Sequence, residues 1–381
     1  MRYRRLGGTG LQVSVIGLGT WQFGGEWGKD FTQSEVDRLV GRAGELGVNL
    51  IDTAECYGDH LAETLVGRTI ARDRDRWIVA TKFGHRFHPD RAAQAGADPG
   101  SVRTSHWSPA EVAAQLDASL HALSTDYIDV YQSHGGSDSD FATPGLWEAL
   151  DRQVQAGKIR HLGVSLDPGD AARAARARAV GAGVVQVTYN RLNRAAEYSV
   201  LPAAAGQGLG VLAREPLANG FLSGKYRPGS RITTPGDWRS SQDAADVDAR
   251  LAQAEQIATS EVPAEVPLAR WALAWCLQHP AVSAVIPGSK TIEQLEGNLA
   301  AAALAIRSMT SSQVTGSSSL EALAAAADAA ARAALHTLNI PGRQRHSGRA
   351  QKARPKFAHA SATKKTVTGK PRVQVFAPGF S

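Results

Sequence analysis

The sequence predicts an α/β protein whose main domain is a (β/α)8 TIM barrel and whose C-terminal tail is basic and disordered. Eight short runs rich in Val and Ile recur along the chain, and each precedes a stretch with helical periodicity. This alternation is typical of parallel βα units, and eight such units close into a barrel. The runs begin at Val13, Asn49, Trp77, Tyr127, Ile159, Val184, Gly210 and Val282.

Length and composition limit the class of protein. The chain has 381 residues, 43% of them hydrophobic, which suffices for one large barrel or two ordinary domains. No apolar run reaches the roughly 20 residues of a membrane helix, and the first residues lack the apolar core of a secretory signal. We therefore expect a cytoplasmic protein with no membrane partner. With two cysteines and no cluster of zinc-ligand spacing, no metal is expected, and Cys56 is expected to pack in the interior rather than act as a redox sensor.

Local signals mark several element ends. Thr32, with Glu35 three residues later, forms a capping box, and Ser108, followed by Pro109, opens another helix. Gly-Gly and Thr-Gly turns within residues 1–14 predict a hairpin that closes the barrel floor.

Two long connections follow predicted strands, at residues 84–108 and 224–248. Active sites of barrels lie on the loops after the strands, so we expect these connections to wall the substrate and cofactor clefts, although solvated excursions are the alternative. Trp21, Trp107 and Trp238 lie in or near strand-end loops, where they would either line an apolar substrate pocket or pack in the core.

Positive charge is concentrated at the end of the chain. Residues 343–372 carry ten Lys or Arg and no acidic residue, so removing them from the net charge of +6 leaves the rest near −4. A mildly acidic main domain argues against a nucleic-acid-reading surface there. We predict a barrel in 1–306, a Ser/Ala-rich, partly helical extension in 307–342, and a disordered basic tail in 343–381. The tail is compatible with weak nucleic-acid binding, with a solvated segment, or with an aberrant reading frame.

Four chemically active side chains lie where predicted strands end. Asp52 ends the second strand and Tyr57 follows it, Lys82 lies near the end of the third, and His134 ends the fourth. The C-terminal ends of barrel strands meet around one mouth, where these residues can converge. Taken singly, each also fits a structural role as a loop cap, a packed ring, a rim charge or a satisfied polar residue.

Together the four residues form a proton-donating relay. A phenol with its ordinary pKa near 10 is a poor acid at neutral pH, and a nearby ammonium lowers that pKa by roughly one to three units. Lys82 is the candidate ammonium, which Asp52 would hold charged and in place. His134 would orient a carbonyl group or stabilise negative charge on its oxygen, and Tyr57 would deliver the proton.

Phosphate-binding features follow the last two predicted strands. No G-x-G-x-x-G both follows a strand and opens a helix, so a Rossmann site is not expected. Barrels instead bind phosphates at the loops after strands seven and eight. There the chain has glycines, a helix start at Thr291, and the cations Lys225 and Lys290, although ordinary glycine turns are the alternative.

Over roughly residues 1–305 the sequence resembles the aldo-keto reductases. Seven stretches in the family order carry the resemblance: GLGTWQFGG, NLIDTAECYGDHLAETLVG, TKFG, DVYQSH, GKIRHLGVS, REPLANGFLSGKY and VIPGSKTIEQLEGN. The resemblance implies that Asp52, Tyr57, Lys82 and His134 are the catalytic tetrad, with Tyr57 as general acid and base. These roles agree with the ones argued from residue chemistry.

The resemblance also implies a set of cofactor contacts. Ser165 and Gln186 would hold the nicotinamide carboxamide, and residues 216–225 would wrap the pyrophosphate. Lys290 would meet the 2′-phosphate, which favours NADPH over NADH, although one Lys is a weaker indication than an Arg making two hydrogen bonds. The expected cofactor residues are Gly19, Thr20, Ser165, Gln186, Arg214, Pro216, Leu217, Gly220, Leu222, Gly224, Lys225, Gly288, Ser289, Lys290, Gln294 and Asn298.

The sequence departs from the family at three places. Leu166 stands where the family usually has Asn, and Arg214 stands near an aromatic position, where its guanidinium plane could stack on the nicotinamide instead. The C-terminal segment that commonly shapes the substrate pocket is replaced by Ser- and Ala-rich sequence and the basic tail. The sequence therefore does not identify the carbonyl substrate.

The sequence also resembles the branch of the family that contains the potassium-channel beta subunits. Two hypotheses for function are therefore considered. The first is an NADP-dependent oxidoreductase that reduces an aldehyde or ketone to an alcohol by hydride transfer, with Tyr57 as general acid. The second is a cofactor-binding, redox-sensing or regulatory module with little turnover. The complete tetrad favours the first, and turnover of a carbonyl panel distinguishes them. The expected partner is a small-molecule carbonyl compound, and the oligomeric state stays open.

Overall fold

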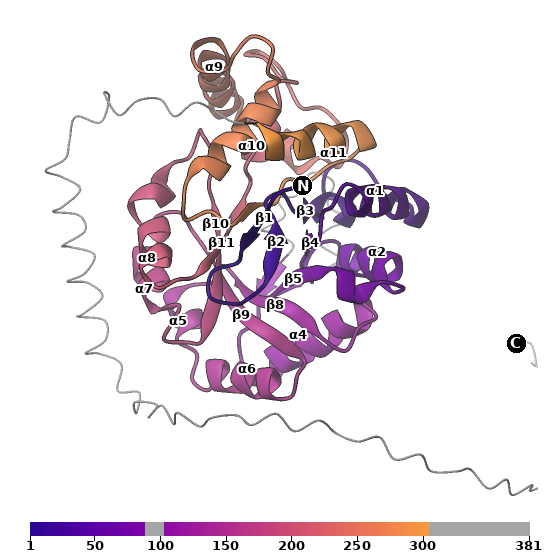
Figure 1. Ribbon diagram of the computed structural model, residues 1–381, viewed down its shortest axis with the longest axis vertical. Coiled ribbons are helices and arrows are strands. Elements are labelled where there is room, and N and C mark those ends of the chain that lie inside the picture. Colours follow the sequence, from indigo (N-terminus) through magenta and orange to yellow (C-terminus); the bar gives the residue numbers. More distant parts are fainter. Residues whose placement is uncertain (88–102, 305–381) are drawn as a thin grey trace, which may run out of the picture. The chain divides into compact units, whose positions relative to one another are not determined.

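The computed structural model of the protein describes residues 1–87 and 103–304. Its main element is a sheet of eight parallel strands in the order β12-β11-β10-β9-β8-β5-β4-β3 (Figure 1). Parallel bridges from Ile16 to Val285 and from Gly19 to Gly288 join the first strand to the last, so the sheet closes into the predicted barrel. The strands are β3 (Leu18–Gly19), β4 (Leu50–Asp52), β5 (Ile78–Phe83), β8 (Ile128–His134), β9 (Ile159–Leu166), β10 (Ala182–Thr188), β11 (Gly210–Arg214) and β12 (Ala284–Val285).

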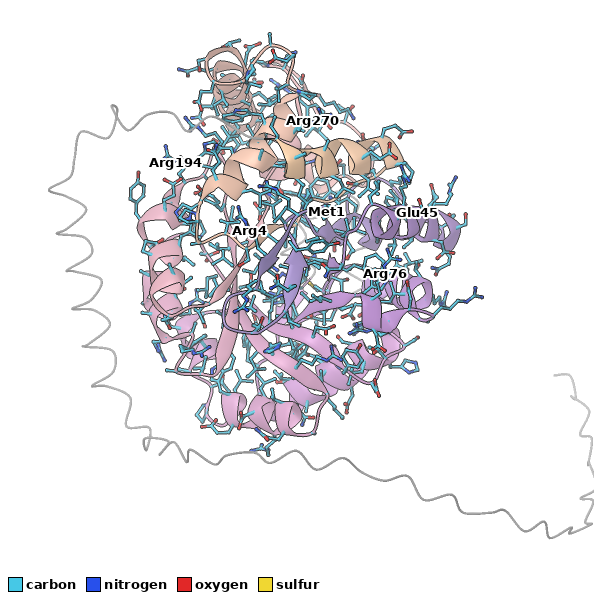
Figure 2. The ribbon with its side chains drawn as sticks, in the orientation of Figure 1. Met1, Arg4, Glu45, Arg76, Arg194 and Arg270 are labelled. Carbon is cyan, nitrogen blue, oxygen red and sulfur yellow. The ribbon has the colours of Figure 1, made fainter. Side chains whose placement is uncertain are left out.

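Helices follow the strands and surround the barrel (Figure 1). The predicted capping box at Thr32 and the predicted helix start at Ser108 are confirmed, and the side chain of each accepts a hydrogen bond from the amide three residues later. The helices turn apolar faces toward the strands, while charged side chains such as Glu45 lie on the outside (Figure 2). They are α1 (Gln33–Glu45), α2 (Leu61–Ile70), α4 (Pro109–Ala122), α5 (Asp138–Phe141), α6 (Leu146–Gln155), α7 (Ala171–Arg176), α8 (Val200–Gly206), α9 (Ala244–Ser260), α10 (Leu268–Gln278) and α11 (Ile292–Leu299).

The lower part of the barrel is a packed core rather than a pore. Six strands each contribute one inward side chain to a fully buried cluster, and the floor adds two more. Side chains of this size fill an eight-stranded barrel. Any ligand site is therefore restricted to the C-terminal ends of the strands. The cluster contains Leu6, Val13, Leu50, Ala80, Val130, Val184, Leu212 and Ala284.

The predicted floor hairpin is confirmed as β1 (Tyr3–Arg5) paired antiparallel with β2 (Gln12–Ser14). Arg4 holds it to the barrel by donating to the carbonyl oxygens of Leu277 at 2.8 Å and Val282 at 2.6 Å (Figure 2). The first predicted strand run, which began at Val13, is wrong at its start. Val13 and Ser14 pair with β1, and the barrel strand β3 begins only at Leu18.

The first long connection begins and ends in a short antiparallel pair, β6 (His85–Phe87) with β7 (Arg103–Ser105). The second contains a 3-10 turn at Trp238–Ser241, and Asp237 bridges to Trp27. Within 1–87 and 103–304, no helix has the length and apolar character needed to cross a membrane. The predicted helical extension and basic tail lie outside these residues, as do their boundaries.

Candidate active site

The strand ends bring together Asp52, Tyr57, Lys82 and His134 at one end of the barrel. Lys82 is 1% exposed, and its Nζ donates to Asp52 Oδ2 at 2.9 Å, to the Thr53 carbonyl at 2.7 Å and to Tyr57 Oη at 3.2 Å. The rings of Tyr57 and His134 meet edge to face with centroids 6.1 Å apart. A buried ammonium with three oxygen partners has no donor left over. Tyr57 Oη accepts from Lys82, so its own O–H remains available to another group.

The Asp52 carboxylate accepts a second hydrogen bond that the sequence did not predict. Gln186, on β10, donates from Nε2 to Asp52 Oδ1 at 2.7 Å. The sequence resemblance gave Gln186 only a role at the nicotinamide. Because 134 positions separate the two residues, no local pattern reveals this contact.

The pKa of Tyr57 does not follow the sequence-based expectation. Burial raises the pKa of the phenol to about 12, and the nearby charge of Lys82 lowers it by less than burial raises it. The expected net lowering is therefore wrong, because desolvation outweighs the ammonium. Tyr57 keeps its proton at neutral pH, as a general acid must.

Lys82 is positively charged, whereas His134 is neutral. Burial alone would lower the pKa of Lys82, but Asp52 and Tyr57 together raise it above its ordinary value, so Lys82 stays an ammonium. Burial, followed by the positive charge of Lys82, holds the pKa of His134 well below its ordinary value. His134 is therefore a neutral imidazole, with one ring N–H to donate.

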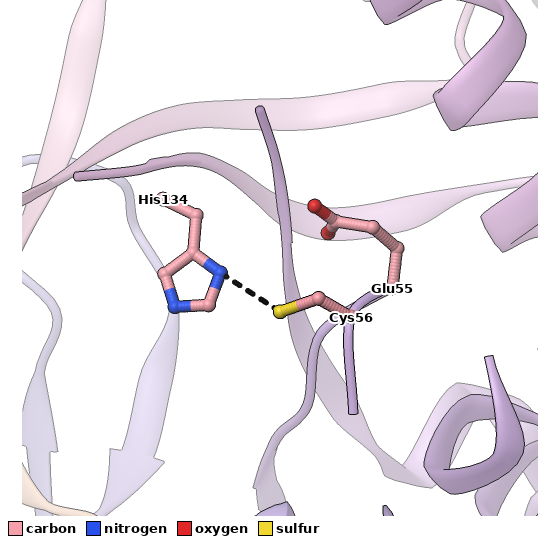
Figure 3. Close-up of side chains that lie close together, drawn as sticks. All are labelled: Glu55, Cys56 and His134. Carbon is pink, nitrogen blue, oxygen red and sulfur yellow. Dashed lines mark hydrogen bonds between the residues drawn. The ribbon is translucent and has the colours of Figure 1, made fainter. Parts of the chain in front are cut away.

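His134 also belongs to a group of three potential metal ligands, together with Glu55 and Cys56 (Figure 3). Their ligand atoms lie within 4.8 Å of one another. Burial raises the pKa of both the Cys56 thiol and the Glu55 carboxyl, the latter to about 8. Metal ligands must be deprotonated, so these shifts work against metal binding at neutral pH.

A cavity of about 540 Å³ opens above the tetrad, and Asp52, Tyr57 and His134 line it while Lys82 lies buried behind them. Its volume is within the range of small-molecule and cofactor sites. The expected cofactor residues that line it are Gly19, Thr20, Ser165, Gln186, Arg214, Pro216, Leu217, Gly220, Lys225, Gly288, Lys290, Gln294 and Asn298. Three others, Leu222, Gly224 and Ser289, are not part of the lining. Leu222 packs in an apolar cluster, and the Ser289 hydroxyl accepts from Asn298 Nδ2 at 3.1 Å.

The loop after β11 has an unusual backbone. Glu215, Ala218 and Asn219 have φ values of 54°, 48° and 55°, and Gly220 follows at 94°. A Cβ atom at Gly220 would lie 2.8 Å from Nη1 at the tip of the Arg239 side chain, so the backbone conformation rather than space favours glycine there. Left-handed non-glycine residues cost energy and cluster at ligand sites. This loop curves along the cavity, and the Nε of Arg214 there is buried without a hydrogen-bond partner. Its shape and free donor fit a bound pyrophosphate-containing cofactor.

Lys290, the expected 2′-phosphate contact, already has partners. Its Nζ donates to the Trp27 carbonyl at 2.6 Å and lies 4.0 Å from Asp237 Oδ2. Asp237 is bound more closely by Arg239 at 2.7 Å. Lys290 thus lines the cavity as a cation that an anionic group could share.

Both long connections form cavity walls, as predicted. Arg103 comes from the first, and its Nη2 donates to both carboxylate oxygens of Glu26 at 2.9 Å, while Tyr226 and Arg239 come from the second. Sequence reasoning missed Arg103, because its ion pair with Glu26 spans 77 positions. It also missed Trp27, which lines the cavity.

Of the three tryptophans considered, only Trp21 lines the cavity. It stacks on Trp238 with ring centroids 5.6 Å apart and on Tyr57 at 6.1 Å. Trp107 instead packs in the core against Phe83, at 5.5 Å between centroids. Two departures from the family, Leu166 and Arg214, also line the cavity, and Arg214 forms an ion pair with Glu215.

Comparisons with known proteins agree with this geometry. The sequence model described as "Aldo/keto reductase family" matches residues 15–318. An uncharacterized oxidoreductase of Bacillus subtilis (strain 168), YrpG, is 33% identical over 320 residues, which cover 80% of this chain and 92% of that protein. The NADH-specific methylglyoxal reductase of Escherichia coli (strain K12) is 29% identical over 306 residues, 78% of this chain and 92% of that protein.

A solved structure gives the same result. The holo form of the aldo-keto reductase AKR11C1 from Bacillus halodurans superposes with a TM-score of 0.65 at 27% identity, covering 81% of this chain and 92% of that chain. The narrower resemblance to the potassium-channel beta subunits is not supported by these matches and stays a prediction. The family match and the fold lead to one assignment: the chain belongs to the aldo/keto reductase family.

Proposed function

We propose that this protein is an NADPH-dependent reductase that converts an aldehyde or ketone to an alcohol, with Tyr57 as the general acid. One observation carries the proposal: Tyr57 Oη accepts a hydrogen bond from the buried ammonium of Lys82 at 3.2 Å, while Tyr57 itself lines the cavity. The phenol can therefore give its O–H proton to a group in the cavity, and the ammonium stabilises the phenolate that remains.

The neighbouring residues have separate tasks in this mechanism. Asp52 holds Lys82 charged and in place, and the N–H of neutral His134 donates to the carbonyl oxygen and polarises it. When bound, the nicotinamide would supply a hydride to the carbonyl carbon. Tyr57 then protonates the alkoxide oxygen, which is a stronger base than its phenolate, and regains a proton from solvent.

The cofactor choice rests on charge at one end of the cavity. Lys290 and Lys225 both line it, and Lys290 is the proposed partner of a 2′-phosphate. The ion pair with Asp237 reduces the charge that Lys290 offers, and a relative is named as NADH-specific. We propose NADPH as the preferred cofactor, and a comparison of the two dissociation constants tests it.

The test of the proposal is turnover of a carbonyl panel by the wild-type protein, Tyr57→Phe and the control Tyr198→Phe. Tyr198 is 62% exposed and outside the cavity lining. We expect Tyr57→Phe to lower kcat by about 10²- to 10⁴-fold, the usual range for general acid catalysis, with NADPH binding retained. Turnover of Tyr57→Phe close to wild type would contradict the role of the phenol. Tight NADPH binding by the wild type with no turnover on any carbonyl would favour the regulatory module instead.

A further inference from the structure

The imidazole of His134 contacts a thiol on the side away from the cavity. Its Nδ1 lies 3.4 Å from Cys56 Sγ, and the second ring nitrogen points away from the sulfur (Figure 3). His134 lines the cavity beside Tyr57, whereas Cys56 is fully buried and is not part of the lining. The ring edge that faces the cavity is therefore the one that carries Nε2.

Only one of the two neutral tautomers of His134 suits the proposed reaction. A neutral imidazole has one N–H, on either Nδ1 or Nε2, and the other nitrogen presents a lone pair. With the proton on Nε2, the ring donates to a carbonyl oxygen in the cavity. With the proton on Nδ1, a lone pair would face that oxygen and repel it. The environment of Nδ1 therefore determines whether His134 can polarise a substrate.

The chemistry of the Cys56 contact favours the productive tautomer. Thiol sulfur is a weak acceptor, whereas the unprotonated ring nitrogen is a good one, so S–H donating to Nδ1 is the better arrangement. Burial raises the pKa of Cys56, which keeps the thiol proton in place. Near this pair, Glu55 Oε2 is buried without a hydrogen-bond partner. Glu55 carries a proton at neutral pH, so without the thiol this oxygen becomes an alternative acceptor for a proton on Nδ1 only above the raised pKa of about 8.

We propose that Cys56 is a positioning residue for the reductase reaction. Its S–H donates to Nδ1 of His134 and keeps the imidazole proton on Nε2, where it faces the carbonyl oxygen. The effect on rate rests on the proposed function. The tautomer does not, because it is observable in the full-length protein with no substrate present.

The direct test is nuclear magnetic resonance of the full-length protein labelled with ¹⁵N in histidine, with His134→Gln used to assign the signals. Long-range proton–nitrogen correlations distinguish a protonated from an unprotonated ring nitrogen. We expect the proton of His134 on Nε2 in the wild type and in Cys56→Ser, whose hydroxyl also donates. In Cys56→Ala, we expect a mixture of tautomers at neutral pH and a proton on Nδ1 above pH 8, where Glu55 is ionised and can accept it.

The kinetic test uses the same pair, because Ser and Ala differ only in the donor group. Loss of one weak hydrogen bond predicts about a three- to tenfold fall in kcat for Cys56→Ala, with the NADPH dissociation constant unchanged. Cys56→Ser should restore most of kcat. Cys276→Ala is the matched control, since Cys276 is also a fully buried thiol but donates to the Tyr189 carbonyl at 3.4 Å, outside the cavity lining.

Several results would overturn the inference. One is a wild-type signal with the proton on Nδ1, and another is an Nε2–H tautomer that persists in Cys56→Ala. Equal losses of kcat in Cys56→Ser and Cys56→Ala would mean that the thiol acts through packing alone. If the wild type shows the expected tautomer but reduces no carbonyl, the proposed function fails while the hydrogen-bond assignment is supported.

Discussion

Replacing Lys82 by Met removes the positive charge beside the Tyr57 phenol while keeping an unbranched side chain of similar size. The Nζ atom lies 3.2 Å from the phenolic oxygen. At an effective dielectric constant of about 20, an ammonium and a phenolate at this separation attract each other by about 5 kcal/mol. That attraction develops as Tyr57 gives up its proton. We therefore expect kcat of Lys82→Met to fall by about three to four orders of magnitude.

A second variant separates this effect from damage to the fold. Lys82→Met alone leaves the buried carboxylate of Asp52 without its cation, which typically costs about 3–5 kcal/mol of stability. The double variant Asp52→Asn with Lys82→Met removes both charges and should regain much of that stability.

The assay is single-turnover oxidation of NADPH with a saturating aldehyde, alongside thermal unfolding and NADPH binding by fluorescence. Both variants should bind NADPH and lose the rate of the chemical step to a similar extent. A double variant that is folded, binds NADPH and reacts within about tenfold of the wild-type rate would refute the reasoning.

Three further predictions concern stability, pH and cofactor choice. Asp129→Ala should lower the free energy of unfolding by about 3–5 kcal/mol, because it leaves the Arg74 guanidinium, 2.8 Å from this fully buried carboxylate, without its counterion. In urea denaturation the exposed Asp117→Ala should change little, and equal losses would contradict the prediction. Burial raises the pKa of Glu55 from 4.5 to about 8, so between these values the folded protein binds a proton that the unfolded chain releases, and stability falls as pH rises. Glu55→Gln should reduce the slope of that fall by up to about 1.4 kcal/mol per pH unit, and an unchanged slope in denaturation series would disprove the assignment. Lys290→Met should weaken NADPH binding about tenfold while changing NADH binding little, as measured by calorimetry; equal weakening of both would remove Lys290 as the 2′-phosphate partner.

The fold was largely predictable because its signals are local. All eight predicted strand runs overlap their barrel strand, and the run from Val13 starts too early because its first residues belong to the floor hairpin. The helix starts at Thr32 and Ser108 were predictable for the same reason, since a capping box involves residues three positions apart. The barrel then follows from the repetition of one unit.

The candidate site was predictable in position but not in detail. Residues at the C-terminal ends of barrel strands meet because the strands are parallel, so placing Asp52, Tyr57 and His134 there required only their position in the chain. Their hydrogen-bond partners are set by the tertiary structure. Gln186 binds Asp52 across 134 positions, and no pattern in the sequence pairs them.

The sequence by itself determined the barrel, the helix starts and which reactive groups stand at the strand ends, because each depends on neighbours along the chain. Only the tertiary structure decided the protonation states. The pKa of Tyr57 rises although Lys82 is adjacent, and His134 is neutral with Cys56 behind it. Both outcomes depend on how much water is excluded and on which distant groups face each other. These quantities are properties of the packed barrel, not of any one segment.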